Sequence, residues 1–191
     1  MIPPFLSAWF DHRAIETEES TLVALDAAGQ ILWVNAAWER FALANDGADV
    51  ARRFGPGTSY LDGMAEPFRS FFNAALSNTL MTGEVFESDY ECSSTDTFRM
   101  FHMRALPIER EGLLLEHSLV VEHPHVRLSV ELKEEAYVQP NGMVLQCGNC
   151  RRIRRAVAVA WDWIPAWVRS PPPRTSHGIC NTCLGFYWGR R

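Results

Sequence analysis

The sequence predicts an α+β fold, in which helices cover one face of an antiparallel sheet, followed by a small metal-binding module. The first observation is the order of its elements: two strand-like segments, then helices, then three strand-like segments. The second is a set of two Cys-x-x-Cys pairs near the end of a chain of 191 residues with five cysteines. Because 47% of residues are hydrophobic and 21% are charged, we expect a packed core rather than disorder.

The first strands form a hairpin. Residues 21–26 and 31–34 are rich in β-branched and other apolar side chains, and Gly29 lies in the turn between them, where a positive φ is tolerated. Asn35 follows as a helix N-cap, since its side chain can accept a hydrogen bond from an early backbone N–H. We therefore expect a helix over residues 36–44.

The remaining elements follow from periodicity and turn residues. Phe68, Phe72 and Leu76 are spaced for an amphipathic helix, which Gly83 ends. The expected elements are a short helix over 5–15, a loop over 45–58, a helical turn over 59–65, a helix over 66–81, and strands over 84–92, 97–107 and 112–122.

Several of these segments resemble a PAS sensor domain. The run from Val23 to Trp38, with Trp-Val-Asn before the first helix, resembles the opening of that domain. The run Tyr60-Leu61-Asp62 resembles its Asn-Tyr-Leu segment, and Tyr90 to Cys92 followed by Phe98 to Phe101 resembles a pair of its strands. The resemblance covers about residues 20–123. It implies a domain that senses a small ligand or docks a partner.

The sequence departs from this PAS pattern at three positions. Glu91 and Ser93 replace the usual proline and histidine, and Met100 replaces a tryptophan. Ligand chemistry that depends on those residues is therefore not carried over, and the ligand is not identified. The candidate pocket residues are Trp33, Trp38, Phe41, Tyr60, Phe72 and Cys92. The alternative is that the tryptophans are core residues and Cys92 is a small buried hydrophobe.

These patterns divide the chain into four parts. They are a lead-in over residues 1–20, a PAS-like domain over 21–123, a linker over 124–140 and a four-cysteine module over 141–191. Within the linker, residues 128–135 are expected to form a short helix or strand, and Pro140 to Gly142 a turn.

The four cysteines of the last part have the spacing of a metal site. Cys147 and Cys150 form one pair, and Cys180 and Cys183 form the other. Two intervening residues let both thiolates of a pair reach one ion, and two pairs complete a tetrahedral shell with Zn–S distances of about 2.3 Å. A module of about 50 residues has little core of its own, so a structural zinc would stabilise it. We therefore predict a zinc-ribbon-like module with a strand, a knuckle and a second strand around the first pair, and a helix within residues 161–168.

Other roles for the cysteines remain open. A redox dithiol pair, an iron–sulfur cluster or a zinc site that responds to oxidation would use the same residues. His177 could replace a ligand or support one by a hydrogen bond. The tail also resembles a cysteine-rich segment that follows some PAS or receiver domains, on Cys150 to Arg154 and Ser176 to Cys180, but this resemblance implies no biochemical role.

Charge is distributed unevenly along the chain. Residues 1–125 carry 8 Lys and Arg against 19 Asp and Glu, whereas residues 126–191 carry 10 against 4. Four arginines, Arg151, Arg152, Arg154 and Arg155, cluster beside the first cysteine pair. They form a candidate surface for a protein partner or for nucleic acid, or they offset the negative charge of the thiolates.

The function expected from these features is signalling without catalysis. The sequence contains no phosphate-binding glycine loop, dinucleotide fingerprint or nucleophile elbow. We expect a PAS-like domain coupled to a structural zinc module that contacts a protein partner: a kinase, a regulator or a second copy in a dimer. Nucleic-acid binding and a thiol redox switch are the alternatives. No apolar run reaches the length of a membrane span and no signal peptide is evident, so we expect a cytoplasmic protein without a membrane partner.

Overall fold

The computed structural model describes residues 2–45 and 48–189. They divide into two compact units. Among the described residues, the first comprises 2–45, 48–63, Arg69–Tyr90 and Phe101–Val120, and the second comprises Met64–Phe68, Glu91–Met100 and 121–189. None of the helices described is long and apolar enough to cross a membrane.

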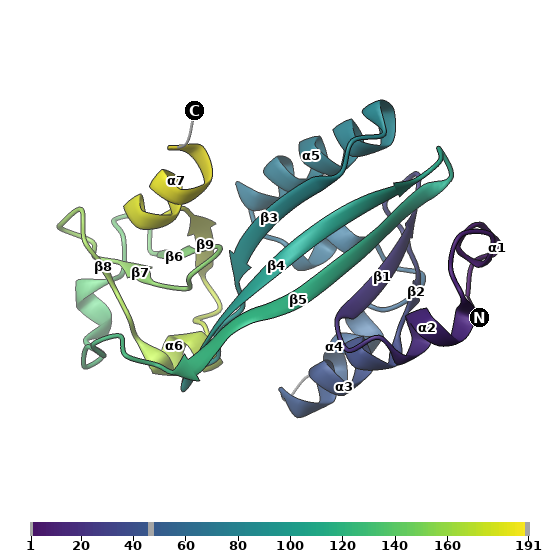
Figure 1. Cartoon of the computed structure of the whole chain (residues 1–191). Helices are drawn as coiled ribbons and strands as arrows, with labels where there is room; N and C mark the ends of the chain where they lie inside the picture. Colours follow the sequence, from purple (N-terminus) through teal and green to yellow (C-terminus); the bar gives the residue numbers. More distant parts are fainter. Residues whose placement is uncertain (1, 46–47, 190–191) are drawn as a thin grey trace. The chain divides into compact units, whose positions relative to one another are not determined.

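A five-stranded sheet forms the centre of the first unit, and its order is β2-β1-β5-β4-β3 (Figure 1). Its strands are β1 (Thr21–Asp26), β2 (Ile31–Val34), β3 (Phe86–Glu91), β4 (Thr97–Ile108) and β5 (Gly112–Pro124). Strand β1 pairs antiparallel with both β2 and β5. Short turns join β3 to β4 and β4 to β5, with Ser94 N–H donating to the Thr97 carbonyl and Glu111 N–H to the Ile108 carbonyl. The expected α+β class with an antiparallel sheet is confirmed.

Asn35 fixes the junction between the first hairpin and the helix that follows it. Its side chain is fully buried and accepts hydrogen bonds from the backbone N–H of Trp38 at 3.1 Å and of Leu22 at 3.0 Å. The helix α3 (Ala36–Ala44) begins directly after this cap. Gly29 has a φ of 79°, so the positive φ expected in the turn is present.

The helices on one face of the sheet are α3, α4 (Ala48–Arg53), a 3-10 turn η1 (Tyr60–Gly63) and α5 (Phe68–Thr82). Residues 48–53 correct the expected loop over 45–58, of which residues 46–47 lie outside the description. Asp49 in the first turn and Arg52 in the last favour this helix and form an ion pair at 2.9 Å. The core between sheet and helices contains Val23, Leu25, Ile31, Leu76, Ala105, Leu113 and Leu115.

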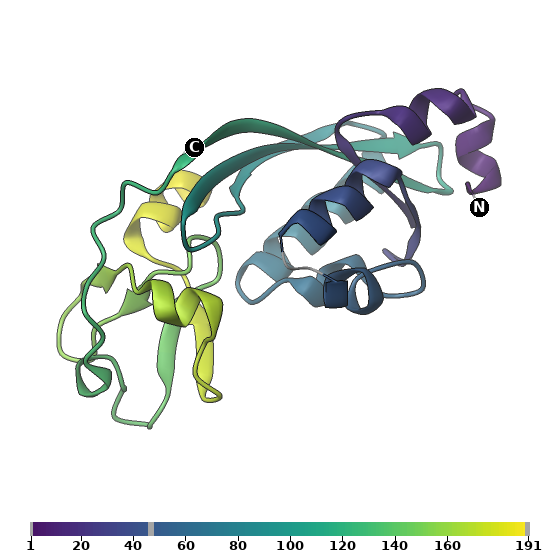
Figure 2. The same ribbon diagram turned by 90° about the horizontal axis from the view of Figure 1, so that it is seen from below.

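Two short N-terminal helices lie on the opposite face of the same sheet (Figure 2). They are α1 (Pro4–Ser7) and α2 (His12–Thr17), in place of the single helix expected over 5–15. Leu6 and Ile15 pack there with Leu22, Trp33 and Leu114. The sheet is therefore apolar on both faces, which explains why β1 is buried at four consecutive positions rather than at alternate ones.

The second unit contains a smaller sheet of order β8-β7-β6-β9. Its elements are η2 (Glu134–Ala136), β6 (Val144–Cys147), β7 (Ile153–Arg154), β8 (Trp161–Asp162), α6 (Pro165–Arg169), β9 (Thr175–Gly178) and α7 (Asn181–Trp188). Strands β6 and β7 are the strand pair expected around the first cysteine pair, and Pro165 begins a helix within the predicted region. Strands β6 and β9 are parallel, a pairing that the sequence does not predict.

Residues from 124–140 contribute to the core of this second unit. Tyr137 is buried against Val144, Ile153, Ile164 and Trp167, and its hydroxyl donates to Asp162 at 2.8 Å. The expected turn before β6 is present, with Gly142 at a φ of 76° and its N–H donating to the Gln139 carbonyl. The division into a domain, a linker and a module remains a prediction.

Candidate metal centre

The two cysteine pairs occupy different local structures. Cys147 ends β6, and Cys150 lies three residues later in the tight connection to β7. Cys180 is the N-cap of α7, and Cys183 lies in its first turn. Because β6 and β9 run parallel, their C-terminal ends lie side by side. This places Cys147, at the end of β6, close to Cys180, which follows β9. The parallel pairing is therefore what joins two pairs separated by 29 residues in the sequence.

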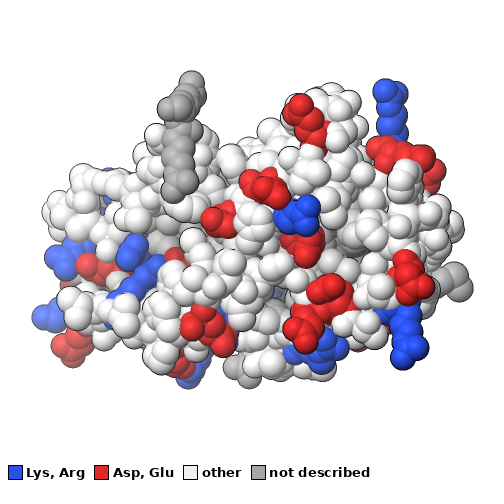
Figure 3. Space-filling view, viewed as in Figure 1, with Lys and Arg blue, Asp and Glu red and all other residues white. Residues whose placement is uncertain are grey.

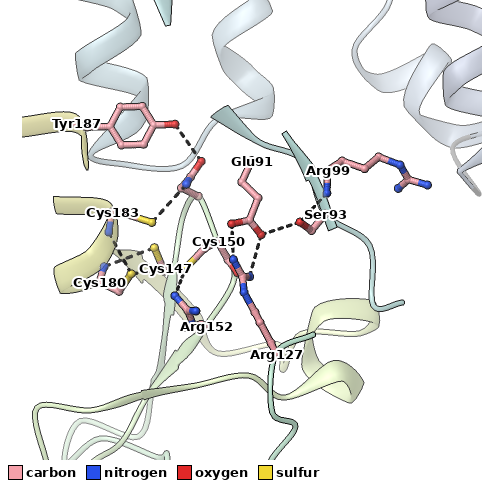
Figure 4. Close-up of polar contacts among 11 residues, drawn as sticks. Glu91, Ser93, Arg99, Arg127, Cys147, Cys150, Arg152, Cys180, Cys183 and Tyr187 are labelled. Atoms are coloured by element: carbon pink, nitrogen blue, oxygen red, sulfur yellow. Dashed lines mark hydrogen bonds and ion pairs between the residues drawn. The ribbon is translucent and has the colours of Figure 1, made fainter. Parts of the chain in front are cut away.

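The four sulfur atoms form a compact buried group. All four Sγ atoms lie within 4.8 Å of one another, and all four residues are buried. Cys150 Sγ and Cys180 Sγ, from different pairs, are 3.5 Å apart (Figure 4). A tetrahedral site with Zn–S bonds of about 2.3 Å places its sulfurs about 3.8 Å apart. The cluster therefore has the size of a single four-thiolate site, and it can hold a metal ion.

Each sulfur receives its own N–H donor. Cys147 Sγ accepts from the Cys180 backbone and Cys180 Sγ from the Cys183 backbone, both at 3.5 Å. Cys183 Sγ accepts from Asn149 Nδ2 at 3.3 Å, and Cys150 Sγ accepts from Arg152 at 3.9 Å. Donors directed at all four sulfurs stabilise negative charge on them, as expected for thiolate ligands.

The ionisation of the four thiols is strongly interdependent. A hydrogen bond from Cys150 lowers the pKa of Cys147 to about 6, and one from Cys147 lowers the pKa of Cys180. Hydrogen bonding with Cys147 raises the pKa of both Cys150 and Cys183. Four negative charges at this separation repel one another, so all four groups become thiolates together when a cation lies among them.

A hydrogen-bonded chain extends from Cys183. Asn149, which donates to Cys183, accepts a hydrogen bond from the Tyr187 hydroxyl at 3.2 Å. The Tyr187 ring packs edge-on against Phe68 with centroids 5.0 Å apart. A Cβ at Gly148 would lie 3.2 Å from the Phe68 ring, so glycine permits this close packing. The connection between Cys147 and Cys150 is thus held by the hydrogen bonds of Asn149 and by the packing of Gly148 against Phe68.

His177 lies apart from this cluster. It is an exposed residue of β9, paired with Gln146 of β6, and it is not among the side chains whose donor atoms gather with the four sulfurs. Asn149 and Arg152, rather than His177, are the side chains that donate to the sulfurs.

The four arginines beside the first pair have different surroundings. Arg152 donates to a cysteine sulfur, and Arg155 pairs with Asp162 at 2.5 Å. Arg151 is exposed and Arg154 is half-buried. On the face shown in Figure 3, basic side chains over the second unit are interspersed with acidic ones. Two of the four arginines are therefore engaged within the protein, which leaves a smaller cationic surface than the sequence suggests.

Sequence reasoning missed Arg127. Its guanidinium forms a two-pronged ion pair with Glu91, at 2.8 and 2.5 Å, and donates to the Cys150 carbonyl at 3.2 Å (Figure 4). The only signal in the sequence was the unusual Glu91 within the PAS-like motif. A lone arginine in an expected linker gives no indication of its partner.

The six expected pocket residues have four kinds of surroundings. Trp33 lies in the apolar cluster with α1 and α2, whereas Trp38 and Tyr60 pack against the core on the other face. Phe41 contacts Phe101, and Phe72 contacts Phe71 and Phe86, all edge-on. Cys92 belongs to the second unit, where burial raises the pKa of its thiol. Trp38 and Tyr60 therefore share one apolar cluster and Trp33 belongs to another, and the pocket formed by the six residues stays a prediction.

A cavity of about 330 Å³ nevertheless lies in the first unit beside α3. Phe41, Phe101 and His117 contribute to its lining. His117 is buried, and burial lowers its pKa to about 4, so the imidazole is neutral near pH 7. Its Nδ1 lies 3.1 Å from the Tyr90 hydroxyl and its Nε2 3.5 Å from the Tyr60 hydroxyl. Sequence reasoning did not select His117, because its neighbours Tyr60 and Tyr90 are far away in the sequence.

No family model matches this chain, and neither does any curated protein. Among solved structures, it is similar to the complex of phage VqmA with DPO, at 12% identity and a TM-score of 0.42 over 56% of this chain; the match spans half of that chain. It is also similar to a PAS domain from Colwellia psychrerythraea, at 10% identity and a TM-score of 0.42, over 56% of this chain and 92% of that one. A third is the PAS domain of nitrogen regulation protein NR(II) from Vibrio parahaemolyticus, at 19% and 0.37, over 56% and 95%. These matches assign neither a family nor a ligand to this chain.

Proposed function

We propose that this protein is a non-enzymatic signalling protein, in which a PAS-like region senses a ligand or docks a partner and a structural zinc module presents a surface to another protein. The observation that carries the proposal is the buried cluster of four sulfurs, each with its own N–H donor. Zinc suits four thiolates in a tetrahedral shell, and four protein ligands leave no open position for a catalytic water.

The signalling part of the proposal is supported by the PAS-like motifs and by the cavity beside His117. A neutral imidazole and aromatic side chains line this cavity, whose volume lies at the lower end of the range of small-molecule pockets. The thiols of the metal site must be reduced to bind zinc, which fits the cytoplasm. The partner is proposed to be a protein, and a second copy of the chain is one such partner.

Native mass spectrometry of the purified full chain tests this proposal directly, because one spectrum reports bound metal, bound small molecule and oligomeric state. We expect one zinc ion per chain. The variant Cys147→Ser should lose this ion, and the variant Cys92→Ser should retain it. If the protein carries no metal after purification from a zinc-containing medium, the proposed metal centre is wrong. A chain that binds neither small molecule nor protein partner would contradict the signalling role.

A thiol redox switch is a second candidate, favoured by the distance of 3.5 Å between Cys150 Sγ and Cys180 Sγ. Hydrogen peroxide would oxidise these two thiols to one disulfide and would itself be reduced to two molecules of water, with release of the metal. The test is zinc release under mild peroxide, followed by recovery of zinc binding after addition of a thiol reductant. Irreversible loss of binding, or no release, would count against the switch.

A further inference from the structure

Arg127 connects the metal site to a hairpin of the large sheet, within the second unit. One of its guanidinium nitrogens donates both to Glu91 and to the backbone carbonyl of Cys150, a candidate ligand. Glu91 ends β3, and Arg127 lies just beyond the end of β5. The ion-paired side chains are 14% and 7% exposed, so water hardly competes for the pair. This is a buried, bidentate and charge-assisted contact, the strongest kind available to these side chains.

The partner residues in the hairpin are those that depart from the PAS pattern. Glu91 replaces the usual proline and Ser93 the usual histidine. Ser93 Oγ donates to Glu91 at 2.7 Å and accepts from the Arg99 backbone N–H at 3.2 Å (Figure 4). Both departures therefore serve one network, which orders the turn between β3 and β4 around the carboxylate that Arg127 binds.

Aromatic rings enclose the guanidinium. It lies over Trp163 at 5.1 Å from the ring centroid and over Phe98 at 5.7 Å. The His125 ring packs against Trp163 with centroids 4.3 Å apart, and its pKa is lowered by burial and by the charge of Arg127. His125 is therefore neutral near pH 7, and the rings of Trp163 and Phe98 fix the position of the Arg127 guanidinium.

A second ion pair to the same hairpin provides a contrast. Arg169 and Asp96 approach to 3.9 Å, and their side chains are 77% and 83% exposed. Exposed pairs of this kind contribute little, whereas loss of one partner from a buried pair leaves an uncompensated charge. Arg127, and not Arg169, is thus the cation that holds residues 91–100 to the cysteine-containing segment.

We propose that Arg127 is a positioning residue through which metal binding at the four cysteines orders residues 91–100. The inference rests on the proposed metal centre. Metal loss frees the Cys150 backbone, which removes one acceptor of Arg127 and loosens its hold on Glu91. By reciprocity, an intact Glu91–Arg127 pair strengthens metal binding.

Hydrogen–deuterium exchange of the full chain, with zinc and after chelation, tests the proposal when the zinc content of each sample is read by native mass spectrometry. In the unmodified protein, we expect chelation to accelerate exchange in peptides from residues 91–100 by about tenfold, a typical size for coupling between sites. The same peptides should stay protected in the zinc-bound state.

The double variant Glu91→Met with Arg127→Met removes the link without leaving an unpaired buried charge, so it is expected to fold. Its residues 91–100 should exchange at a rate that no longer depends on zinc, and its zinc affinity should fall about tenfold. Arg169→Met is the matched control, because it removes an arginine that reaches the same hairpin from the surface. It should behave as the unmodified protein does.

The outcomes separate this proposal from the metal centre on which it rests. If zinc binds but chelation leaves residues 91–100 unchanged, the coupling is wrong and the metal centre stands. The coupling is also wrong if the double variant responds to zinc as the unmodified protein does. If no zinc binds in any sample, the metal centre itself fails, and the coupling fails with it.

Discussion

Different kinds of interaction stabilise the interior of each of the two compact units. The first has a continuous apolar core on both faces of a five-stranded sheet, and its buried polar groups, such as Asn35, are satisfied by neutral hydrogen bonds. The second has a small apolar cluster around Tyr137, and it relies on four clustered thiols and on the buried pair of Glu91 and Arg127. Apolar burial stabilises the one, and polar contacts that need specific partners stabilise the other.

The difference shows how stability should depend on conditions. An apolar core loses stability gradually as its contacts are weakened. A metal site and a buried ion pair fail abruptly, since the removal of a single partner leaves charges without compensation. We therefore expect chelators and the loss of a single metal ligand to act on the second unit before they act on the first.

The largest effect is expected for Cys150→Ser. A structural zinc site of this type contributes on the order of 10 kcal/mol to folding, and the loss of one ligand removes most of that contribution. The second unit should lose its ordered amide signals in an NMR spectrum, whereas signals of residues 21–26 and 31–34 should persist. Cys92→Ser should leave both sets unchanged. Equal loss of signals in both units would show that the fold of the first unit depends on the metal site as much as that of the second.

The next effect concerns the buried ion pair. Arg127→Met should lower the free energy of unfolding by about 3–5 kcal/mol, because Glu91 would remain as an unpaired buried charge. Arg169→Met should change it by less than about 1 kcal/mol, because its pair with Asp96 is exposed. Urea denaturation of the zinc-bound protein measures both values. Similar losses in the two variants would mean that burial does not distinguish these pairs.

In the first unit, the expected effect is a dependence of stability on pH through His117. Its pKa is about 4 when folded, below the ordinary value of 6.5, because burial disfavours the charged form. The unfolded chain therefore binds a proton more readily, and stability should fall by about 3 kcal/mol as the pH drops from above 6.5 to about 4.

The variant His117→Gln should remove that part of the pH dependence, and His12→Gln, at an exposed position of α2, should not. Thermal unfolding of the zinc-bound protein between pH 5 and pH 8 provides the comparison. Below this range, protons compete more strongly with zinc for the thiolates. A slope that His117→Gln leaves unaltered would place the responsible proton elsewhere.

The smallest effect is expected for Asn149→Ala. Its amide donates to Cys183 and accepts from Tyr187, so its loss removes one contact that orients a ligand. Zinc affinity measured by competition with a chelator should fall about tenfold, with the fold retained. Asn141→Ala, in the turn before β6, is the control at an exposed position. An unchanged affinity in Asn149→Ala would show that the remaining N–H donors suffice.

Local patterns predicted most of the first unit from the sequence. The hairpin around Gly29, the cap at Asn35, the helix over 68–82 and the three following strands depend on neighbours along the chain, and they are present. The gathering of Cys147, Cys150, Cys180 and Cys183 was also predictable, because the spacing within each pair restricts the geometry. The helix over 48–53 was missed, because its alanine and glycine surroundings indicate a loop equally well.

Contacts between distant segments account for what the sequence did not predict. The parallel pairing of β6 with β9 and the contact of Glu91 with Arg127 each join residues about 30 or more positions apart. No periodicity encodes such partners. Trp33 shows a related difficulty: its apolar side chain indicates burial, but the face on which it is buried depends on the N-terminal helices.

The position of Glu91 also affects how the chain can be dissected. A truncated protein that stops at residue 123, where the motif resemblance ends, would lack Arg127 and expose a carboxylate that the full chain buries at 7% exposure. The turn between β3 and β4 would then carry a charge selected for a partner that is no longer there. Exchange of the cysteine-rich tail between proteins, whether by recombination or by engineering, would need to bring residues 91–100 along with it.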